Sequence, residues 1–455
     1  MRCLPWGEKV IPSCLYRYTN QDFRRAAAAQ SAEAGKHEHA GGRGFGHRNS
    51  CDANEAGAAG AADSADSGGS AGAQGNAVKR VPVGRPSFAG LVDIEPNIGT
   101  KVGETFSTLD ARPQDDTLPP MSDMMRAMVA TGFGGPEVFE LQHLPHPVPG
   151  TRQVLLRVRA SSVNPIDTKI RRGALAHLAP DPMILGCDAA GEVVAACPDT
   201  PWKTGDRLMT CGAGVKGHPG GLAEYLLAEA DLCARCPDGL SWEACASLPL
   251  VGLTAEEGLT RGGVRAGQRI LVHAGTGGVG QIAIQLAKER GAEVWATVST
   301  PEKAAHAREL GADGVIFYRE QAVPDYVREI TGGAGFDVVF DTVGGDNVAK
   351  CFEAAAVSGT VVSISTRTAA DLSPLHAKGL SLHVVFMIIP LLYNQPGPRA
   401  VQGKMLAHLS QLAAAGRIKP LLDSRVFPFE QAGAAHALLE SGNAIGKVTL
   451  TGFAD

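Results

Sequence analysis

The sequence predicts an α/β protein in which a strand-rich, barrel-like domain precedes a doubly wound parallel sheet. Short apolar runs broken by Gly, Pro and Asp fill residues 124–250, which is typical of a strand-rich domain. From residue 269 onward, apolar strands alternate with helical segments, as in a parallel sheet covered by helices. The chain has 455 residues, 44% of them hydrophobic, so it is long and apolar enough for two cores.

Residues 1–123 differ in composition from the rest. Segment 56–76, AGAAGAADSADSGGSAGAQGN, lacks large apolar side chains, so we expect a disordered low-complexity extension. Arg24 and Arg25 precede an alanine run, which weakly resembles an organelle transit peptide. An unstructured extension or a misplaced start codon explains the same residues. We therefore expect a cytoplasmic protein, or a chloroplast or mitochondrial one if the extension is a transit peptide.

The strand-rich domain is predicted to begin with two strands joined by a turn at Gly134, Gly135 and Pro136. RAMVATGF (126–133) and VFELQHL (138–144) alternate between apolar and polar residues, as strands with one buried face do. QVLLRVRASSVN (153–164) continues this pattern as a third strand.

The parallel sheet is predicted from RILVHAG (269–275), AEVWATV (292–298), GVIFY (314–318), FDVVFDTV (336–343) and TVVSIS (360–365). The helix VGQIAIQLAKERG (279–291) separates the first two strands and ends at Gly291. The next helix has Thr300 as its cap and Pro301 in its first turn. Two more helices, within 405–416 and 429–442, and a last strand, KVTLTGF (447–453), complete the chain.

Composition argues against several partners. The formal net charge of −5 gives no electrostatic basis for binding nucleic acid. The longest apolar run, 380–393, contains His383 and Pro390 and is shorter than the ~20 residues of a membrane span. We interpret this run as a buried strand followed by a turn. The ten scattered cysteines suit a reducing compartment.

The most specific motif is a glycine loop between a predicted strand and the helix it opens: Gly275, Thr276, Gly277, Gly278, Val279 and Gly280. In this context G-x-G-x-x-G is typical of dinucleotide binding, because it gives a tight turn, close backbone approach to a pyrophosphate, and close helix–strand packing. The helix N-terminus then offers free amides to the phosphates. The alternative is a glycine-rich turn without a ligand.

The end of the second strand indicates which dinucleotide is bound. NAD sites usually place Asp or Glu there, to bind the ribose 2′-hydroxyl, whereas this chain has Ser299. A small hydroxyl leaves room for a 2′-phosphate, and Lys303 can supply a positive charge. The residues favour NADPH over NADH, with a solvated helix residue as the alternative interpretation of Lys303.

The chain resembles the medium-chain dehydrogenase/reductase superfamily, and within it the zinc-free quinone oxidoreductase (zeta-crystallin-like) group. The resemblance rests on RAMVATGFGGPEVFEL, VNPIDTKIRRG, ILGCDAAGEV, GLTAEEGL, VHAGTGGVGQIAIQLAKERGA and STPEKAAHARELGAD. It implies a GroES-like catalytic domain at 124–250, a Rossmann domain at 251–389, and a C-terminal segment, 390–455, that returns to the catalytic domain. It also implies a substrate cleft between the domains, and a homodimer formed through the sheet edge around 384–389.

The same resemblance assigns site residues. It implies that Tyr318 joins Ser299 and Lys303 at the 2′-phosphate. Along the cofactor it places the further residues Ser363, Ile364, Phe386, Met387 and Lys447. Asn164 and Thr254 fall near the nicotinamide and are the candidate catalytic residues. Asn164 is our first candidate to orient the acceptor or the nicotinamide; the alternative is that it bonds its own turn before Pro165.

The same comparison predicts that zinc is absent. Zinc enzymes of the superfamily carry a ligand cysteine in a V-C-H-x-D segment, where this chain has Asn164. They carry G-H-E where this chain has Gly186-Cys187-Asp188, and no four closely spaced cysteines form a structural zinc lobe. The pair Cys233 and Cys236 offers only two ligands; we interpret it as coincidental, with a redox pair as the alternative.

These observations predict an enzyme that passes hydride from NADPH to a small quinone or α,β-unsaturated carbonyl. No tyrosine lies between Asp167 and Tyr225, so the sequence does not identify a proton donor. Two alternatives stay open. One is an enoyl-thioester reductase, and the other is an NADPH-binding structural or regulatory protein with little turnover, like some crystallins.

Overall fold

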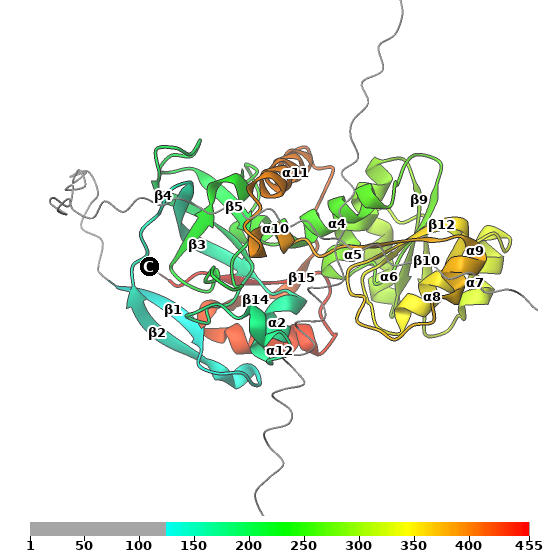
Figure 1. Ribbon diagram of the computed structural model, residues 1–455, viewed down its shortest axis with the longest axis horizontal. Coiled ribbons are helices and arrows are strands. Elements are labelled where there is room, and N and C mark those ends of the chain that lie inside the picture. The colour runs from blue at the N-terminus through cyan, green and yellow to red at the C-terminus, as the bar shows by residue number, and fades with distance from the viewer. Residues whose placement is uncertain (1–123, 455) are drawn as a thin grey trace, which may run out of the picture. The chain divides into compact units, whose positions relative to one another are not determined.

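The computed structural model describes residues 124–454, so the expectations for residues 1–123 lie outside it. Within that range the chain forms a seven-stranded sheet, a six-stranded sheet and a separate two-stranded hairpin (Figure 1). The predicted pairing of a strand-rich domain with a helix-covered parallel sheet is confirmed.

The seven-stranded sheet is built around β3 (Gln153–Ser162), which is largely buried on both faces. Its order is β14-β15-β3-β4-β5-β7, with β6 also paired to β3. The pairs are antiparallel except β14 with β15. The other members are β4 (Asp188–Ala196), β5 (Arg207–Cys211), β6 (Tyr225–Glu229), β7 (Cys233–Arg235), β14 (Leu422–Pro428) and β15 (Lys447–Thr451).

The hairpin lies where the sequence predicts it. β1 (Met124–Ala130) pairs with β2 (Phe139–Pro145), and the short helix η1 (Pro136–Val138) joins them. Helix α2 (Pro165–Arg171) follows β3 directly, because Pro165 fits the first helical position. The remaining short helices here are η2 (Ala176–Leu178), η3 (Ala230–Leu232) and α3 (Trp242–Ala246).

The six-stranded sheet is parallel throughout, in the order β10-β9-β8-β11-β12-β13. The chain runs outward from β8 to one edge, then returns and runs from β11 to the other. This is the doubly wound order of dinucleotide-binding domains, in which ligands bind beyond the carboxyl ends of the strands where the direction reverses. The strands are β8 (Arg269–Val272), β9 (Glu293–Val298), β10 (Gly314–Phe317), β11 (Phe336–Asp341), β12 (Ala355–Ser363) and β13 (Ser381–Val384).

The helices of this sheet follow the local sequence signals. They are α4 (Pro249–Arg261), α5 (Gly278–Glu289), α6 (Pro301–Glu309), α7 (Val323–Thr331), α8 (Asn347–Ala354) and α9 (Ser373–Lys378). The Thr300 side chain caps α6, and Gly291 follows α5 with φ +79°. Residues 280–287 of α5 are all buried, and Gln281 and Gln285 donate to the carbonyls of Leu421 and Lys419.

The apolar run 380–393 differs from its prediction as a buried strand. β13 is short and forms an edge of the parallel sheet, with β12 on one side only. Val384 is 44% exposed, and helix α10 (Ile389–Leu392) follows. Hydrophobicity alone does not distinguish an edge strand from a central one.

The last part of the chain packs against the seven-stranded sheet. Helix α11 (Pro396–Ala414) contacts β7 and η3, and its Arg399 bonds both carboxylate oxygens of Asp231. The short helix η4 (Phe429–Gln431) and α12 (Ala432–Glu440) separate β14 from β15. Among residues 124–454, no helix is both long and apolar enough to cross a membrane.

Candidate active site

A cavity of about 600 Å³ lies where the parallel strands end and the seven-stranded sheet begins. Its walls come from the start of α2, from α4, from the glycine loop, and from the segments after β11, β12 and β13. Nine predicted site residues line it: Asn164, Thr254, Gly277, Gly278, Val279, Ile364, Phe386, Met387 and Lys447. The sequence therefore brings together residues of both sheets at one cavity.

The glycine loop is a tight turn in which three glycines have different roles. A Cβ on Gly280 would lie 2.2 Å from the carbonyl oxygen of Ala274, and one on Gly275 would lie 2.7 Å from Cβ of Ala296. Both glycines therefore allow close packing of loop, helix and strand. Gly277 is the N-cap of α5 and lines the cavity with Gly278. The first amides of a helix have no acceptor within it, so this end of α5 suits an anion.

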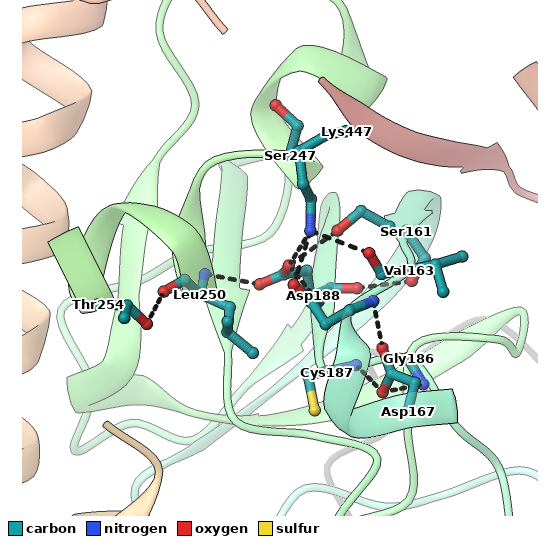
Figure 2. Close-up of polar contacts among 12 residues, drawn as sticks. Ser161, Val163, Asp167, Gly186, Cys187, Asp188, Ser247, Leu250, Thr254 and Lys447 are labelled. Carbon is teal, nitrogen blue, oxygen red and sulfur yellow. Dashed lines mark hydrogen bonds and ion pairs between the residues drawn. The ribbon is translucent and has the colours of Figure 1, made fainter. Parts of the chain in front are cut away.

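A buried polar cluster adjoins the cavity and is centred on Asp188 (Figure 2). Its Oδ2 accepts hydrogen bonds from Nδ2 of Asn164 at 2.8 Å and from Oγ of Ser162 at 2.8 Å. Nζ of Lys447 lies 3.4 Å from the same oxygen. Asp188 and Asn164 are fully buried, and Lys447 is 3% exposed. The carboxylate thus compensates a buried ammonium, as a charge removed from water requires.

The Lys447 ammonium is bound entirely by protein atoms. It donates to Oδ1 of Asn164 at 2.7 Å and to the carbonyl oxygen of Val163 at 3.2 Å, and faces Asp188 as its third partner. An ammonium has three donors, so none remains for another group in this arrangement. Lys447 therefore holds the side-chain amide of Asn164 in place. A direct contact between Lys447 and the cofactor stays a prediction.

Asn164 forms a capping box with Asp167 at the start of α2, and its side-chain amide also has two charged partners. Its amide oxygen faces a donor, Lys447, and its amide nitrogen faces an acceptor, Asp188, so these partners fix the orientation of the amide. The second N–H of Nδ2 has no partner among the described residues, and Asn164 lines the cavity. Asp167 completes the capping box, because its carboxylate accepts from the Asn164 backbone N–H at 2.8 Å.

Asp167 has a structural role, as the sequence suggested. Its Oδ1 accepts from the backbone amides of Gly186 and Cys187. Burial is the main reason that the pKa of Asp167 rises to about 6. Burial also raises the pKa of the Cys187 thiol well above its usual range, so the thiolate that a metal prefers is disfavoured there.

Thr254 lies on α4, one turn after the residue that contacts Asp188. The backbone N–H of Leu250 donates to Oδ1 of Asp188 at 2.8 Å, and the Thr254 hydroxyl donates to the Leu250 carbonyl at 2.7 Å (Figure 2). The proton of this hydroxyl is therefore occupied. Its oxygen can still accept a hydrogen bond from a group in the cavity, such as a ribose hydroxyl.

Ser299, Lys303 and Tyr318 lie away from this cavity. Ser299 follows the last residue of β9, and Tyr318 follows the last residue of β10. These two ends are side by side, because Val298 pairs with Phe317. Nζ of Lys303 donates to the Gly442 carbonyl at 3.3 Å, and Tyr318 is 46% exposed. These residues are at the carboxyl edge of the sheet, where a ribose is expected. Their contact with a 2′-phosphate stays a prediction.

Thr276 and Ser363 do not line the cavity, but their hydrogen bonds hold segments that do. The Thr276 carbonyl accepts from the Gly446 N–H at 2.9 Å, next to Lys447. The Ser363 hydroxyl donates to Oδ2 of Asp341 at 2.8 Å. Asp341 in turn accepts from the Val343 amide at 3.1 Å, and Val343 lines the cavity.

Three residues of the site were missed or misinterpreted in the sequence. From the sequence, Asp188 was considered only within the segment Gly186-Cys187-Asp188 and was given no role at the site, although the structure pairs it with Lys447. Lys169 and Arg367 also line the cavity, and no motif marks them.

The Cys233 and Cys236 pair is not part of the cavity. Both cysteines are buried, one in β7 and one just after it. Burial raises the pKa of Cys233 to about 12, which disfavours the thiolate needed for redox chemistry. Within residues 124–454, no group of three or more His, Cys, Asp or Glu side chains is arranged to hold a metal ion.

Comparisons with known proteins bear on this arrangement. The alcohol dehydrogenase GroES-like domain family matches residues 150–238, and the zinc-binding dehydrogenase family matches residues 310–450. A quinone oxidoreductase of Pseudomonas aeruginosa is 36% identical over 335 residues, which cover 72% of this chain and 99% of the relative. The NADPH-dependent alkenal/one oxidoreductase of Arabidopsis thaliana chloroplasts is 34% identical and covers 72% of this chain and 79% of the relative.

A solved mycobacterial protein in complex with NADPH has the same fold. It superposes with a TM-score of 0.64 at 32% identity, over 72% of this chain and 99% of the mycobacterial chain. The GroES-like match lies within residues 124–250, where the strand-rich domain was predicted.

Proposed function

This chain belongs to the medium-chain dehydrogenase/reductase superfamily, among its quinone oxidoreductase-like members, and from this premise we propose that it is a zinc-independent NADPH-dependent reductase of quinones or α,β-unsaturated carbonyls. The observation that carries the proposal is the mainly apolar cavity that joins the glycine loop to the buried Asn164–Lys447–Asp188 cluster. Such a cavity holds a reactive ring next to an acceptor and keeps water out.

The residues fit a dinucleotide. The free amides at the start of α5 would bind the pyrophosphate of the cofactor. A Cβ on Gly277 would lie 3.1 Å from the carbonyl oxygen of Ala274, so the glycine leaves the loop room for the nucleotide. Phe386 and Met387 line the same cavity and would contact the amide of a bound nicotinamide. Bound NADPH supplies a hydride from its nicotinamide ring.

Residues at the carboxyl edge of the parallel sheet select NADPH over NADH. Ser299 leaves space for a 2′-phosphate, Lys303 supplies the charge, and the neighbouring Tyr318 adds a hydroxyl. An acidic residue at Ser299 would repel that phosphate. These three residues therefore favour NADPH.

Asn164 orients the acceptor. Hydride addition to an enone or quinone places negative charge on the carbonyl oxygen, which an aligned N–H stabilises. The second Nδ2–H of Asn164 is such a donor, and Lys447 and Asp188 hold it in place before the substrate arrives. The Thr254 hydroxyl oxygen would accept a hydrogen bond from the ribose of a bound cofactor.

Zinc does not fit this position. The family description includes zinc binding, yet the place of a ligand cysteine is taken by Asn164, and the nearby Asp188 already compensates the Lys447 ammonium. A cation added there would be repelled by that ammonium. Purified protein should therefore contain far less than one zinc per chain and should keep its activity in a chelator.

We also propose a division into two domains and a homodimer. Residues 124–250 and 390–455 form the catalytic domain, and residues 251–389 form the nucleotide-binding domain. Two copies associate through the β13 edge, where Val384, Phe386 and Ile389 are 44%, 42% and 37% exposed. Sedimentation equilibrium should give twice the chain mass.

The decisive experiment follows NADPH oxidation with ortho-quinones, alkenals and enoyl thioesters in parallel. Turnover of a quinone or alkenal supports the proposal, and Asn164→Ala should reduce kcat by about 10²-fold, the effect of losing one oriented donor. Asn443→Ala, an exposed asparagine outside the cavity, is the matched control. Turnover confined to enoyl thioesters, or tight NADPH binding without any turnover, would contradict the proposal.

A further inference from the structure

Two cations lie at the mouth of the cavity that Asn164 lines. Lys169 comes from α2, and Arg367 comes from the segment after β12. Both side chains are exposed, and both belong to the cavity wall. Along α2, Lys169 is five positions beyond Asn164, a rise of about 7.5 Å. Both charges therefore line the same cavity as Asn164.

Neither cation has an acidic partner among residues 124–454. No Asp or Glu lines the cavity as the structure describes it. The adjoining acid, Glu440, already pairs with Arg171 at 2.6 Å and with Arg172 at 3.7 Å. Partial burial and the charge of Arg367 lower the pKa of Lys169. The two positive charges thus oppose each other, and an anion between them would relieve the repulsion.

We propose that Lys169 and Arg367 bind a carboxylate carried by the acceptor, so that the preferred substrate is a small unsaturated keto acid. This inference rests on the proposed function, whose substrate class it narrows. The guanidinium of Arg367 presents a planar fork of donors that matches a carboxylate, and Lys169 adds a point charge. The carboxylate takes no part in hydride transfer and acts as an anchor.

A phosphate of the cofactor is the other possible source of negative charge. The start of α5 already provides the amides that suit the pyrophosphate, and Lys303 lies near the expected 2′-phosphate. Lys169 and Arg367 are on other elements, α2 and the segment after β12. The acceptor is therefore the source that the arrangement favours.

The test uses a γ-oxo-α,β-unsaturated carboxylate and its methyl ester as paired substrates. It uses the saturated keto acid and its ester as paired ligands for the full chain loaded with NADP⁺, with calorimetry as the readout. Wild-type protein should bind the acid at least tenfold more tightly than the ester and should reduce it with a correspondingly lower KM. Raising the salt concentration should narrow this preference.

The variants Arg367→Gln and Lys169→Gln should each lower the ratio of ester Kd to acid Kd about tenfold. The Kd of the ester and the Kd of NADPH should stay unchanged. Lys404→Ala removes an exposed lysine of α11 that does not line the cavity, and it should change none of these values.

The two proposals fail in different ways. Equal binding of acid and ester by wild-type protein would overturn the carboxylate anchor even if both compounds are reduced. Weaker NADPH binding in the two variants, with no change in acid preference, would assign the cations to the cofactor and also overturn it. Tight, acid-selective binding without turnover of any acceptor would support the anchor and contradict the reductase.

Discussion

The ammonium of Lys447 lies 2.7 Å from Oδ1 of Asn164, although the two residues are 283 positions apart in the chain. The contact joins the first residue of β15 to the residue that begins α2. Because both side chains are buried, the amide of Asn164 cannot turn without breaking a charge-assisted hydrogen bond. The last strand of the chain therefore fixes the orientation of an amide that lines the cavity.

Asp188→Asn should destabilise the protein strongly. The substitution keeps the shape of the side chain but leaves the Lys447 ammonium buried without a compensating charge. We expect the free energy of unfolding to fall by about 3 kcal/mol, measured by urea denaturation. Ser162→Ala, which removes one neutral donor from the same carboxylate, should cost only about 1 kcal/mol. Equal losses in the two variants would show that the charge of Asp188 is not what stabilises the cluster.

Gly280→Ala should impair nucleotide binding more than any exposed glycine substitution. Its Cβ would lie 2.2 Å from the Ala274 carbonyl oxygen, a backbone atom that cannot move without opening the loop. We expect the NADPH Kd, measured by fluorescence titration, to rise more than tenfold. Gly397→Ala in α11 meets nothing within 4 Å and should leave the Kd unchanged. An unchanged Kd for Gly280→Ala would mean that the loop does not hold the nucleotide.

Local signals predicted the nucleotide-binding half of the fold well. The strand and glycine loop before α5, and the cap at Thr300 with Pro301, are set by neighbouring residues. Such features depend on backbone geometry and capping, which a few consecutive residues determine. The sheet order also follows, because parallel strands joined by helices have few arrangements.

The polar cluster could not be predicted in the same way. Asp188, Asn164 and Lys447 meet only after β15 joins β3 in the seven-stranded sheet. Their sequence neighbourhoods show no periodic pattern that links them. For the same reason, the sequence did not show that Lys169 and Arg367 share one cavity, since an exposed cation on a helix usually faces only solvent.

Lys303→Ala should change cofactor preference without changing the fold. Lys303 lies on α6 next to the end of β9, and its backbone N–H donates to the Thr300 hydroxyl. In the described residues, the only hydrogen bond of its side chain is to the Gly442 carbonyl. Loss of a charge-assisted bond to a 2′-phosphate should raise the KM for NADPH about tenfold or more and leave the KM for NADH unchanged. Arg308→Ala, an exposed cation on the same helix, is the control. Equal increases for both cofactors would contradict the assignment of Lys303.

His436→Phe should reduce the sensitivity of the fold to acid. Burial, followed by the charge of Arg171, lowers the pKa of His436 from 6.5 to about 3. The folded state therefore binds fewer protons at this residue than the unfolded state between pH 6.5 and about 3, so stability falls as the pH falls through this window.

Phenylalanine removes that proton-binding site and keeps an aromatic ring against Phe139, whose ring centre lies 4.9 Å away. The free energy of unfolding of His436→Phe should fall less steeply than that of wild type, by up to about 1.4 kcal/mol for each pH unit in this window. Asp167, whose pKa is raised to about 6, has the opposite effect in both proteins and cancels in the comparison. His177→Phe, at an exposed ring, should retain the wild-type slope. Parallel pH profiles for wild type and His436→Phe would show that the buried ring does not link folding to proton binding.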